Sequence, residues 1–231
     1  MLDLIQSFWT TFLYIPIYNL VVFAYNISPG PNFGLAIIGL AILIRFIFLP
    51  FTLLGYRHDQ QLAEEKPLLE KIEQDKALSP REKFEKIGRI TKPHGINPVI
   101  TSLPIFAQLV FLGVLYQIIQ VGLTSIGFHN LYSFVGAPNQ INTSFLGFDL
   151  THPSFILSVA ASGTLFIERV WEYNEKKEAH LSTLSQKWDP LIIPAVGFII
   201  LMLLPSTKAV FAATSVVFSM VIKAIVHLRS S

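Results

Sequence analysis

The stretch GLAIIGLAILIRFIFLPFTLL, residues 34–54, is apolar except for Arg45 and Thr52. An α-helix rises about 1.5 Å per residue, so about 20 residues cross the roughly 30 Å hydrocarbon core of a bilayer. This length and composition predict a membrane-spanning helix. In the whole chain of 231 residues, 52% are hydrophobic and 14% are charged, which is far from the averages of soluble proteins.

Four further segments have the apolar character of membrane-spanning helices. The second predicted span, 98–120, opens after Asn97, a residue type that favours helix starts. The remaining predicted spans are 153–171, 190–205 and 208–227. The last two are so close in sequence that they must form a tight antiparallel pair. The predicted fold class is therefore an all-α, polytopic membrane protein with five transmembrane helices.

Lys and Arg residues set the predicted orientation, because movement of positive charge out of the cytoplasm is disfavoured. Nine of the 17 basic residues lie in 55–97 and four lie in 168–189. The opposite side holds a single basic residue, Lys208, in its three segments, which are 1–33, 121–152 and 206–208. We therefore expect the N-terminus outside, the C-terminus in the cytoplasm, an extracytoplasmic loop at 121–152 and a cytoplasmic loop at 172–189.

Residues 1–30 form a predicted N-terminal interfacial segment. Apolar residues recur at helical spacing before Pro16, with polar residues such as Asp3 and Gln6 on the opposite face. This pattern predicts an amphipathic helix in the membrane interface. The alternative is a sixth span over residues 4–26, which would place a Lys-free N-terminus in the cytoplasm, against the charge pattern.

The segment 55–97 predicts a cytoplasmic helical hairpin. Its charges alternate in sign and its apolar residues fall on helical stripes, as in two amphipathic helices. Ser79 and Glu82 have the spacing of a capping box, with Pro80 at the first helical position, so the second helix is expected to start there. A solvated connector is the simpler interpretation. About 40 residues is long for such a link, however, so we favour an element that contacts partners.

Arg45 constrains function most strongly, because it lies 11 and 9 residues from the two ends of its predicted helix. These separations correspond to about 16 and 14 Å, so the guanidinium is expected near the middle of the membrane. A permanent charge there needs water, a carboxylate or polar protein atoms. No Asp or Glu lies within the apolar core of another predicted span, and Glu168 falls at the cytoplasmic end of the third. The sequence therefore predicts a water-filled cavity, with snorkelling of Arg45 to the cytoplasmic interface as the alternative.

Polar side chains on the other predicted spans are candidates to line this cavity together with Arg45. Gln108 is the hardest of them to explain by helix packing, because its side chain is large and polar. The hydroxyl candidates are Thr101, Ser158, Ser162, Thr214, Ser215 and Ser219. For any one hydroxyl residue packing is the simpler interpretation, since Ser and Thr are common at helix contacts in membranes.

The sequence lacks the motifs of catalytic and metal sites. It contains no Cys, no HExxH, no GxSxG and no Walker loop, and its six His residues are scattered at loops and helix ends. The sequence therefore predicts neither an enzyme nor a metal or other cofactor. A proton-coupled carrier is also disfavoured, because no Asp, Glu or His lies deep within a predicted span.

Several motifs resemble those of the YidC-type membrane protein insertases, a family with mitochondrial and chloroplast relatives. They are Arg45 with Leu-Pro at 49–50, Gly-x-Asn-Pro at 95–98 and Leu-Pro-x-x-x-Gln at 103–108, with further similarity over 148–157 and weaker similarity over 205–222. The resemblance implies a five-helix core around a hydrophilic groove that opens to the cytoplasm and to lipid and is closed on the outside. It also implies that Arg45 and Gln108 face this groove, and that no nucleotide or metal is needed.

The predicted function is a membrane protein insertase of the bacterial inner membrane, which moves nascent hydrophobic helices into the bilayer through a groove that carries Arg45. The expected partners are nascent membrane proteins and the lipid bilayer, with the ribosome and the Sec translocon as further candidates and no nucleic acid as a specific ligand. Two alternatives stay open. One is a small anion channel or facilitator, in which Arg45 selects the ion. The other is a membrane assembly scaffold that only binds partners.

Overall fold

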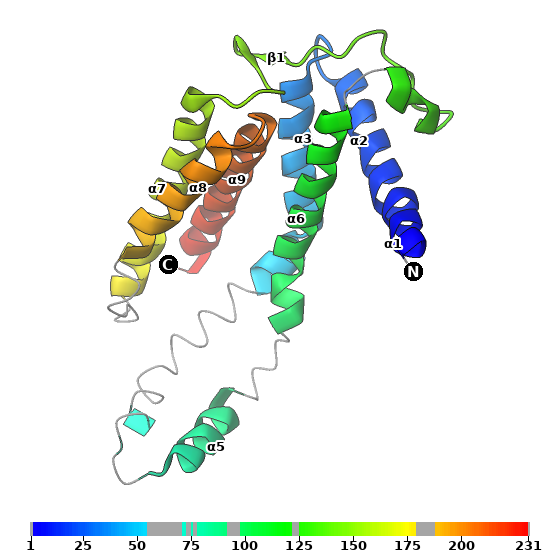
Figure 1. Cartoon of the computed structure of the whole chain (residues 1–231). Helices are drawn as coiled ribbons and strands as arrows, with labels where there is room; N and C mark the ends of the chain where they lie inside the picture. The colour runs from blue at the N-terminus through cyan, green and yellow to red at the C-terminus, as the bar shows by residue number, and fades with distance from the viewer. Residues whose placement is uncertain are drawn as a thin grey trace.

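A computed structural model describes residues 2–54, 71–72, 75, 78–91, 98–121, 125–178 and 188–230. The chain is mostly helical, as predicted. Five helices run beneath a loop that carries a small β-hairpin (Figure 1). They are α3 (Phe33–Ile47), α6 (Pro98–Val121), α7 (Phe155–Glu178), α8 (Asp189–Met202) and α9 (Thr207–Ser230). α9 packs against both α3 and α7, and α7 packs against α8.

These five helices correspond in position to the five predicted spans, but their ends differ. α7 continues to Glu178, so residues 172–178 of the predicted cytoplasmic loop are helical. By length and composition, two helices of the described residues could cross a membrane, Gln6–Ile27 and Thr207–Val226. The shorter apolar helices are Phe33–Ile47, Phe106–Gln120 and Asp189–Met202. The five-span arrangement therefore stays a prediction.

The helix that carries Arg45 is interrupted by a turn at Phe48 and resumes over residues 49–54. Pro50 explains the interruption, because its ring lacks an N–H and disfavours a helical residue before it. The Phe48 N–H still donates to the Ile44 carbonyl at 3.1 Å, so the chain keeps its helical course. Arg45 lies in the last turn of α3, near the middle of the helical stretch 33–54.

The N-terminal segment does not end its helix before Pro16, which corrects the prediction. α1 (Leu2–Phe8), the π-helix η1 (Trp9–Tyr14) and α2 (Ile15–Ile27) follow one another without a break. Pro16 is tolerated because it lies in the first turn of α2, directly after the π-helical turn. The interfacial placement and the sixth span both stay predictions.

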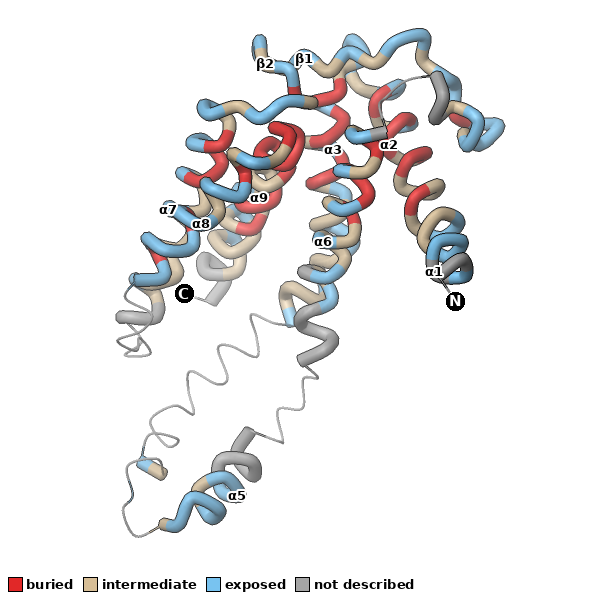
Figure 2. The backbone as a smooth tube through the Cα atoms, in the orientation of Figure 1, coloured by how far each residue is buried: buried red, intermediate tan, exposed pale blue. Residues whose placement is uncertain are grey.

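The core lies at the end of the helices that the loop covers (Figure 2). Side chains of α2, α3, α6 and α9 form it, among them Tyr18, Phe33 and Leu115, each no more than 1% exposed. The rings of Phe111 and Phe211 stack with their centroids 5.1 Å apart and join α6 to α9. Large apolar side chains on α7 and α8 are exposed, as expected of helices that face lipid: Phe155, Ile156, Leu191, Ile192 and Ile199.

The predicted extracytoplasmic loop contains short regular elements, which corrects the purely helical prediction. β1 (Ser144–Phe145) pairs antiparallel with β2 (Phe148–Asp149), and a 3₁₀ turn, η3 (Ser125–Asn130), precedes them. The connecting residues Leu146 and Gly147 both have positive φ, 51° and 84°. Two such residues form the turn type that matches the twist of a tight hairpin.

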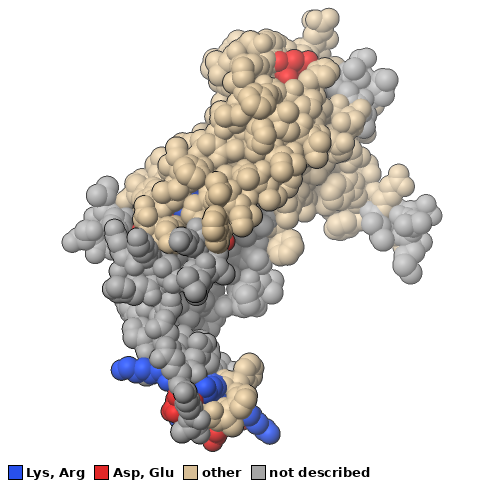
Figure 3. Space-filling view, turned by 60° about the vertical axis from the view of Figure 1, so that its left-hand side comes forward, with Lys and Arg blue, Asp and Glu red and all other residues tan. Residues whose placement is uncertain are grey.

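Of the predicted cytoplasmic hairpin 55–97, the structure describes chiefly α5 (Pro80–Thr91); the predicted first helix lies outside the described residues. The capping box is confirmed. The Ser79 N–H and hydroxyl donate to the Glu82 carboxylate at 2.8 and 2.7 Å. These hydrogen bonds lower the pKa of Glu82. Charged side chains gather around α5, at the end of the molecule away from the β-hairpin, whereas the visible body of the helices is mostly uncharged (Figure 3).

Candidate functional site

Arg45 is partly buried and lies beside the α9 helix. Its neighbour Phe46 packs edge-on against Phe218 of α9, with the ring centroids 5.0 Å apart. On α7, Glu168 lies within range of several charges, those of Glu172, Arg169, Arg45 and Lys223. α7 continues ten residues beyond Glu168, so Glu168 is an interior residue of this helix and not its end.

An ion-pair network joins α7 to α9. Lys223 Nζ lies 2.8 Å from Glu175 Oε2 and 3.8 Å from Glu172 Oε1. Arg169 Nη1 donates to Glu172 Oε2 at 2.7 Å. These four side chains are 17% to 34% exposed, so water screens their charges less than at an open surface. The sequence analysis did not predict this network. Its signal is the spacing of Glu168, Glu172 and Glu175, which are four and three residues apart and so lie on one face of the helix.

Four predicted lining serines lie on two helices that pack against each other. Ser158 and Ser162 of α7 are 0% and 8% exposed, and Ser215 and Ser219 of α9 are 1% and 7% exposed. Ala161 lies between α7 and α9 as well, so small residues allow the two helices to approach closely. Within the described residues, the buried hydroxyls of Ser158, Ser162 and Ser215 have no hydrogen-bond partner. Buried hydroxyls of this kind usually bind water.

The other predicted lining residues lie elsewhere. Gln108 is half-buried on α6. The Thr214 hydroxyl donates to the Val210 carbonyl of its own helix at 2.8 Å, so it is already satisfied. Thr101 is on α6, and its side chain lies outside the described part of the chain. The structure thus groups the serines on α7 and α9, and the common role of the eight predicted residues stays a prediction.

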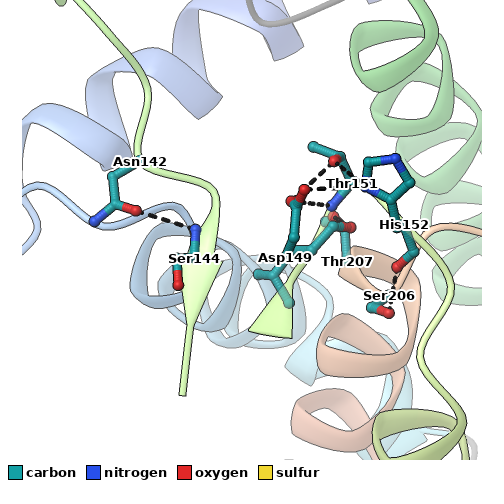
Figure 4. Close-up of polar contacts among 8 residues, drawn as sticks. Asn142, Ser144, Asp149, Thr151, His152, Ser206 and Thr207 are labelled. Atoms are coloured by element: carbon teal, nitrogen blue, oxygen red, sulfur yellow. Dashed lines mark hydrogen bonds and ion pairs between the residues drawn. The ribbon is translucent and has the colours of Figure 1, made fainter. Parts of the chain in front are cut away.

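The loop end of α9 is fixed to the residues that precede α7 (Figure 4). The Ser206 N–H and hydroxyl donate to the His152 carbonyl at 3.0 and 2.6 Å. The Thr207 N–H and hydroxyl donate to the Leu150 carbonyl at 3.0 and 2.7 Å. Ser206, Thr207 and Leu150 are fully buried, so protein groups replace water at this helix start. We call Leu150, His152, Ser206 and Thr207 the loop clamp.

Asp149 orders the backbone that leads into the loop clamp. Its carboxylate accepts hydrogen bonds from the Thr151 N–H and hydroxyl at 3.0 and 2.8 Å, and His152 Nδ1 lies 3.0 Å from Oδ2. Burial raises the pKa of this carboxyl, but the hydrogen bonds from Thr151, Thr143 and His152 outweigh burial and lower the pKa to about 2. Asp149 is therefore ionised at neutral pH.

Lys208, the single basic residue of the predicted extracytoplasmic side, is only 9% exposed. Its Nζ lies 4.1 Å from the centroid of the Tyr116 ring on α6, a cation–π contact that links α9 to α6. On the other side of α6, Trp9 Nε1 donates to Gln117 Oε1 at 2.8 Å and joins η1 to this helix. The sequence assigned no role to either contact, because each joins residues about 100 positions apart.

We expect the substitution Thr207→Val to lower the free energy of unfolding by about 1–2 kcal/mol, because a buried hydroxyl bond to Leu150 is lost. Denaturant unfolding of the purified protein in detergent measures the change. The matched control is Thr214→Val on the same helix, whose hydroxyl bonds only its own backbone. Equal losses in the two variants would contradict a special contribution of the loop clamp.

A family comparison covers almost all of the elements described above. The model of the family described as 60Kd inner membrane protein matches residues 23–231. This chain belongs to that family. The match begins within α2 and includes Arg45 and the loop clamp, and it confirms the YidC-type resemblance that the motifs indicated.

Curated relatives of this 60Kd inner membrane protein family member are named membrane protein insertases. YidC 1 of Bacillus anthracis is 26% identical over 222 residues, which are 92% of this chain and 78% of the relative. MisCA of Bacillus subtilis is 26% identical over 168 residues, 70% of this chain and 58% of the relative. YidC of Nitratidesulfovibrio vulgaris is 36% identical over 111 residues, 47% of this chain and 20% of a longer protein. These names support an insertase function.

Proposed function

We propose that this chain inserts hydrophobic helices of newly made proteins from the cytoplasm into the bacterial inner membrane. The observation that carries the proposal is the family match over residues 23–231, within which an arginine occupies the middle of the first predicted span. The names of the relatives support the same activity. In the proposal, α3, α6, α7, α8 and α9 span the membrane, with the loop clamp on the extracytoplasmic side.

Arg45 is the physical reason for a hydrophilic groove between these helices. Its guanidinium keeps its charge, and surrounding it with hydrocarbon would cost several kcal/mol. Polar groups and water supply its environment in the proposal. Gln108 on α6 and the buried serine hydroxyls of α7 and α9 are the protein groups suited to hold that water.

Insertion then transfers the nascent helix from the water of the groove to the lipid of the bilayer. The polar flank of a nascent helix enters the groove from the cytoplasm, and its apolar segment moves sideways into lipid. The barrier falls because backbone amides and polar side chains cross part of the membrane in water rather than in hydrocarbon. Arg45 attracts flanks that carry Asp or Glu. No covalent bond is made or broken, so the proposal includes neither a catalytic residue nor a cofactor.

The length of α8 supports a short path across the membrane, and the loop clamp supports a groove that is closed on the outside. α8 has 14 residues, or about 21 Å of helix, which is less than the roughly 30 Å hydrocarbon core. A hydrophobic helix that is too short thins the bilayer around it. The loop clamp excludes water where α9 starts, so the groove would stay closed on the extracytoplasmic side.

The α5 helix is suited to make the first contact with a substrate. Its Phe84 side chain is 80% exposed, although the helix is otherwise strongly charged. Arg81 and Glu85 pair across one helical turn at 3.5 Å and leave the aromatic ring uncovered. An exposed aromatic residue among charges can bind an apolar segment without making the free protein insoluble.

Cells depleted of their own insertase test this activity. We expect the chain to restore growth and the membrane insertion of a single-span test protein. Purified protein in liposomes separates the alternatives: insertion without anion flux supports the insertase, and anion flux without insertion supports a channel. A scaffold predicts that deleting residues 60–90 abolishes function whereas Arg45→Ala has no effect.

Single-cysteine labelling tests the proposed topology, and the chain has no Cys of its own to interfere. We expect Asn139→Cys and Ser7→Cys to react with an impermeant maleimide in intact cells. Arg81→Cys should react only after the cells are permeabilised. Labelling of Ser7→Cys from the cytoplasmic side alone would show that Gln6–Ile27 spans the membrane, as the sixth-span alternative requires.

A further inference from the structure

Arg45 and Glu168 lie at the same level of the helix bundle. Arg45 is 12 residues from the start of α3 and Glu168 is 13 residues from the start of α7, or about 18 and 20 Å of helix. Both helices begin at the same loop: the Phe33 N–H donates to the Asn142 carbonyl at 3.1 Å, and α7 follows directly after the loop clamp (Figure 1).

The packing of α9 independently places Arg45 and Glu168 at a similar level of the bundle. Phe218 of α9 contacts Phe46, the neighbour of Arg45, and Lys223 lies five residues further along the same helix. Lys223 pairs with Glu172 and Glu175 of α7. Glu168 is four residues before Glu172 and seven before Glu175, about 6 and 10.5 Å back along α7. The five-residue step from Lys223 back to Phe218, about 7.5 Å, falls between these two distances.

Charged side chains of both signs lie in this part of the molecule. Among those that the structure describes, Arg169 and Lys223 pair with Glu172 and Glu175, and Glu168 is a further carboxylate, at the level of Arg45. Glu168 is itself partly buried, and Arg45 is among the charges that act on it. In such surroundings charges interact over longer distances than in water.

We propose that Glu168 is the resident counter-charge of Arg45 and determines which substrate flanks the groove accepts. This inference rests on the proposed insertase function. Without a substrate, Glu168 offsets Arg45 and lowers the cost of its charge. An acidic flank must compete with Glu168 for Arg45, whereas a basic flank can bind near Glu168. The groove is thereby kept close to neutral and accepts flanks of different charge.

The test compares a single-span test protein with an acidic flank and the same protein with a neutral flank, in proteoliposomes of constant lipid composition. The measured quantity is the ratio of the two insertion yields. We expect Glu168→Gln to raise this ratio by about tenfold, which corresponds to about 1.4 kcal/mol. Arg45→Gln should lower it, because an uncompensated carboxylate is left. The double variant should return it to within about twofold of the wild type, since both charges are absent.

Glu175→Gln is the matched control, because it removes the same charge from the same helix about 10 Å nearer the cytoplasmic end. We expect it to leave the ratio within about twofold of the wild type. An equal response of Glu175→Gln and Glu168→Gln would overturn the proposal in favour of a general charge effect. An unchanged ratio in Glu168→Gln, or no recovery in the double variant, would overturn it as well.

The double variant also covers the case in which Glu168→Gln alone does not fold, because removing both partners leaves no unpaired charge. Its ratio is then compared with that of Arg45→Gln, and equal ratios would reject the role of Glu168. If the wild type inserts neither test protein, the proposed function itself fails. If the wild type inserts both and only the variant ratios disagree with the expectation, the insertase stands and the counter-charge is wrong.

Discussion

The substitution Arg45→Ala is expected to reduce the insertion of a single-span substrate with an acidic flank by about tenfold or more. A flank carboxylate about 7 Å from the guanidinium gains roughly 2 kcal/mol at an effective dielectric constant near 20. Removal of the guanidinium loses this attraction and also exposes the flank to repulsion by Glu168. Protease protection of the translocated flank in proteoliposomes, at matched protein levels, measures the loss.

Two variants show whether the charge of Arg45 is responsible. Arg45→Lys keeps a positive charge, so it should retain insertion to within about threefold of the wild type despite losing the planar hydrogen-bonding fork. Arg81→Ala removes an arginine whose side chain is 90% exposed on α5, and it should have little effect on the acidic flank. Insertion by Arg45→Ala at the wild-type level would show that the charge plays no part.

The substitution Gly34→Ala is expected to destabilise the protein by about 2 kcal/mol or more, because it overfills a close contact. A Cβ at Gly34 would lie 2.6 Å from the Cβ of Phe145 and closer still to its ring. Phe145 is in β1 of the loop hairpin, so relief would require a shift of the hairpin away from α3. Thermal unfolding in detergent, followed by circular dichroism, measures the effect.

Gly39→Ala is the matched control on the same helix, since a Cβ there meets nothing within 4 Å. It should be neutral, or stabilising by up to about 1 kcal/mol, because Ala favours a helix over Gly. Phe145→Ala should remove most of the additional cost of Gly34→Ala when the two are combined. A Gly34→Ala protein as stable as Gly39→Ala would contradict the close packing of the hairpin on α3.

Local patterns were sufficient for much of the fold. The capping box at Ser79 and Glu82 depends on residues three positions apart, so its hydrogen bonds could be predicted from their identities. The positions of α3, α6, α7, α8 and α9 follow from long apolar segments. The family follows from short motifs around Arg45 and Gln108, and the comparison over residues 23–231 confirmed it.

Helix ends and the small loop elements were harder to predict. α7 extends to Glu178 because ion pairs with α9, about 50 residues away in sequence, stabilise a charged stretch that alone resembles a loop. Pro16 suggested a helix end, yet a π-helical turn before it allows the chain to continue. The hairpin at 144–149 places Leu146 at positive φ, a conformation that its sequence does not favour.

The sequence by itself determined that this chain has the composition of a membrane protein, where its apolar helices lie, and that a permanent charge occurs within the first of them. Only the tertiary structure decided which helices lie together near that charge. α9 packs against both α3 and α7, and Phe218 of α9 contacts Phe46, the neighbour of Arg45. The loop clamp likewise joins Thr207 to Leu150, 57 positions apart. Such contacts depend on helix packing over the whole molecule, which no local pattern encodes.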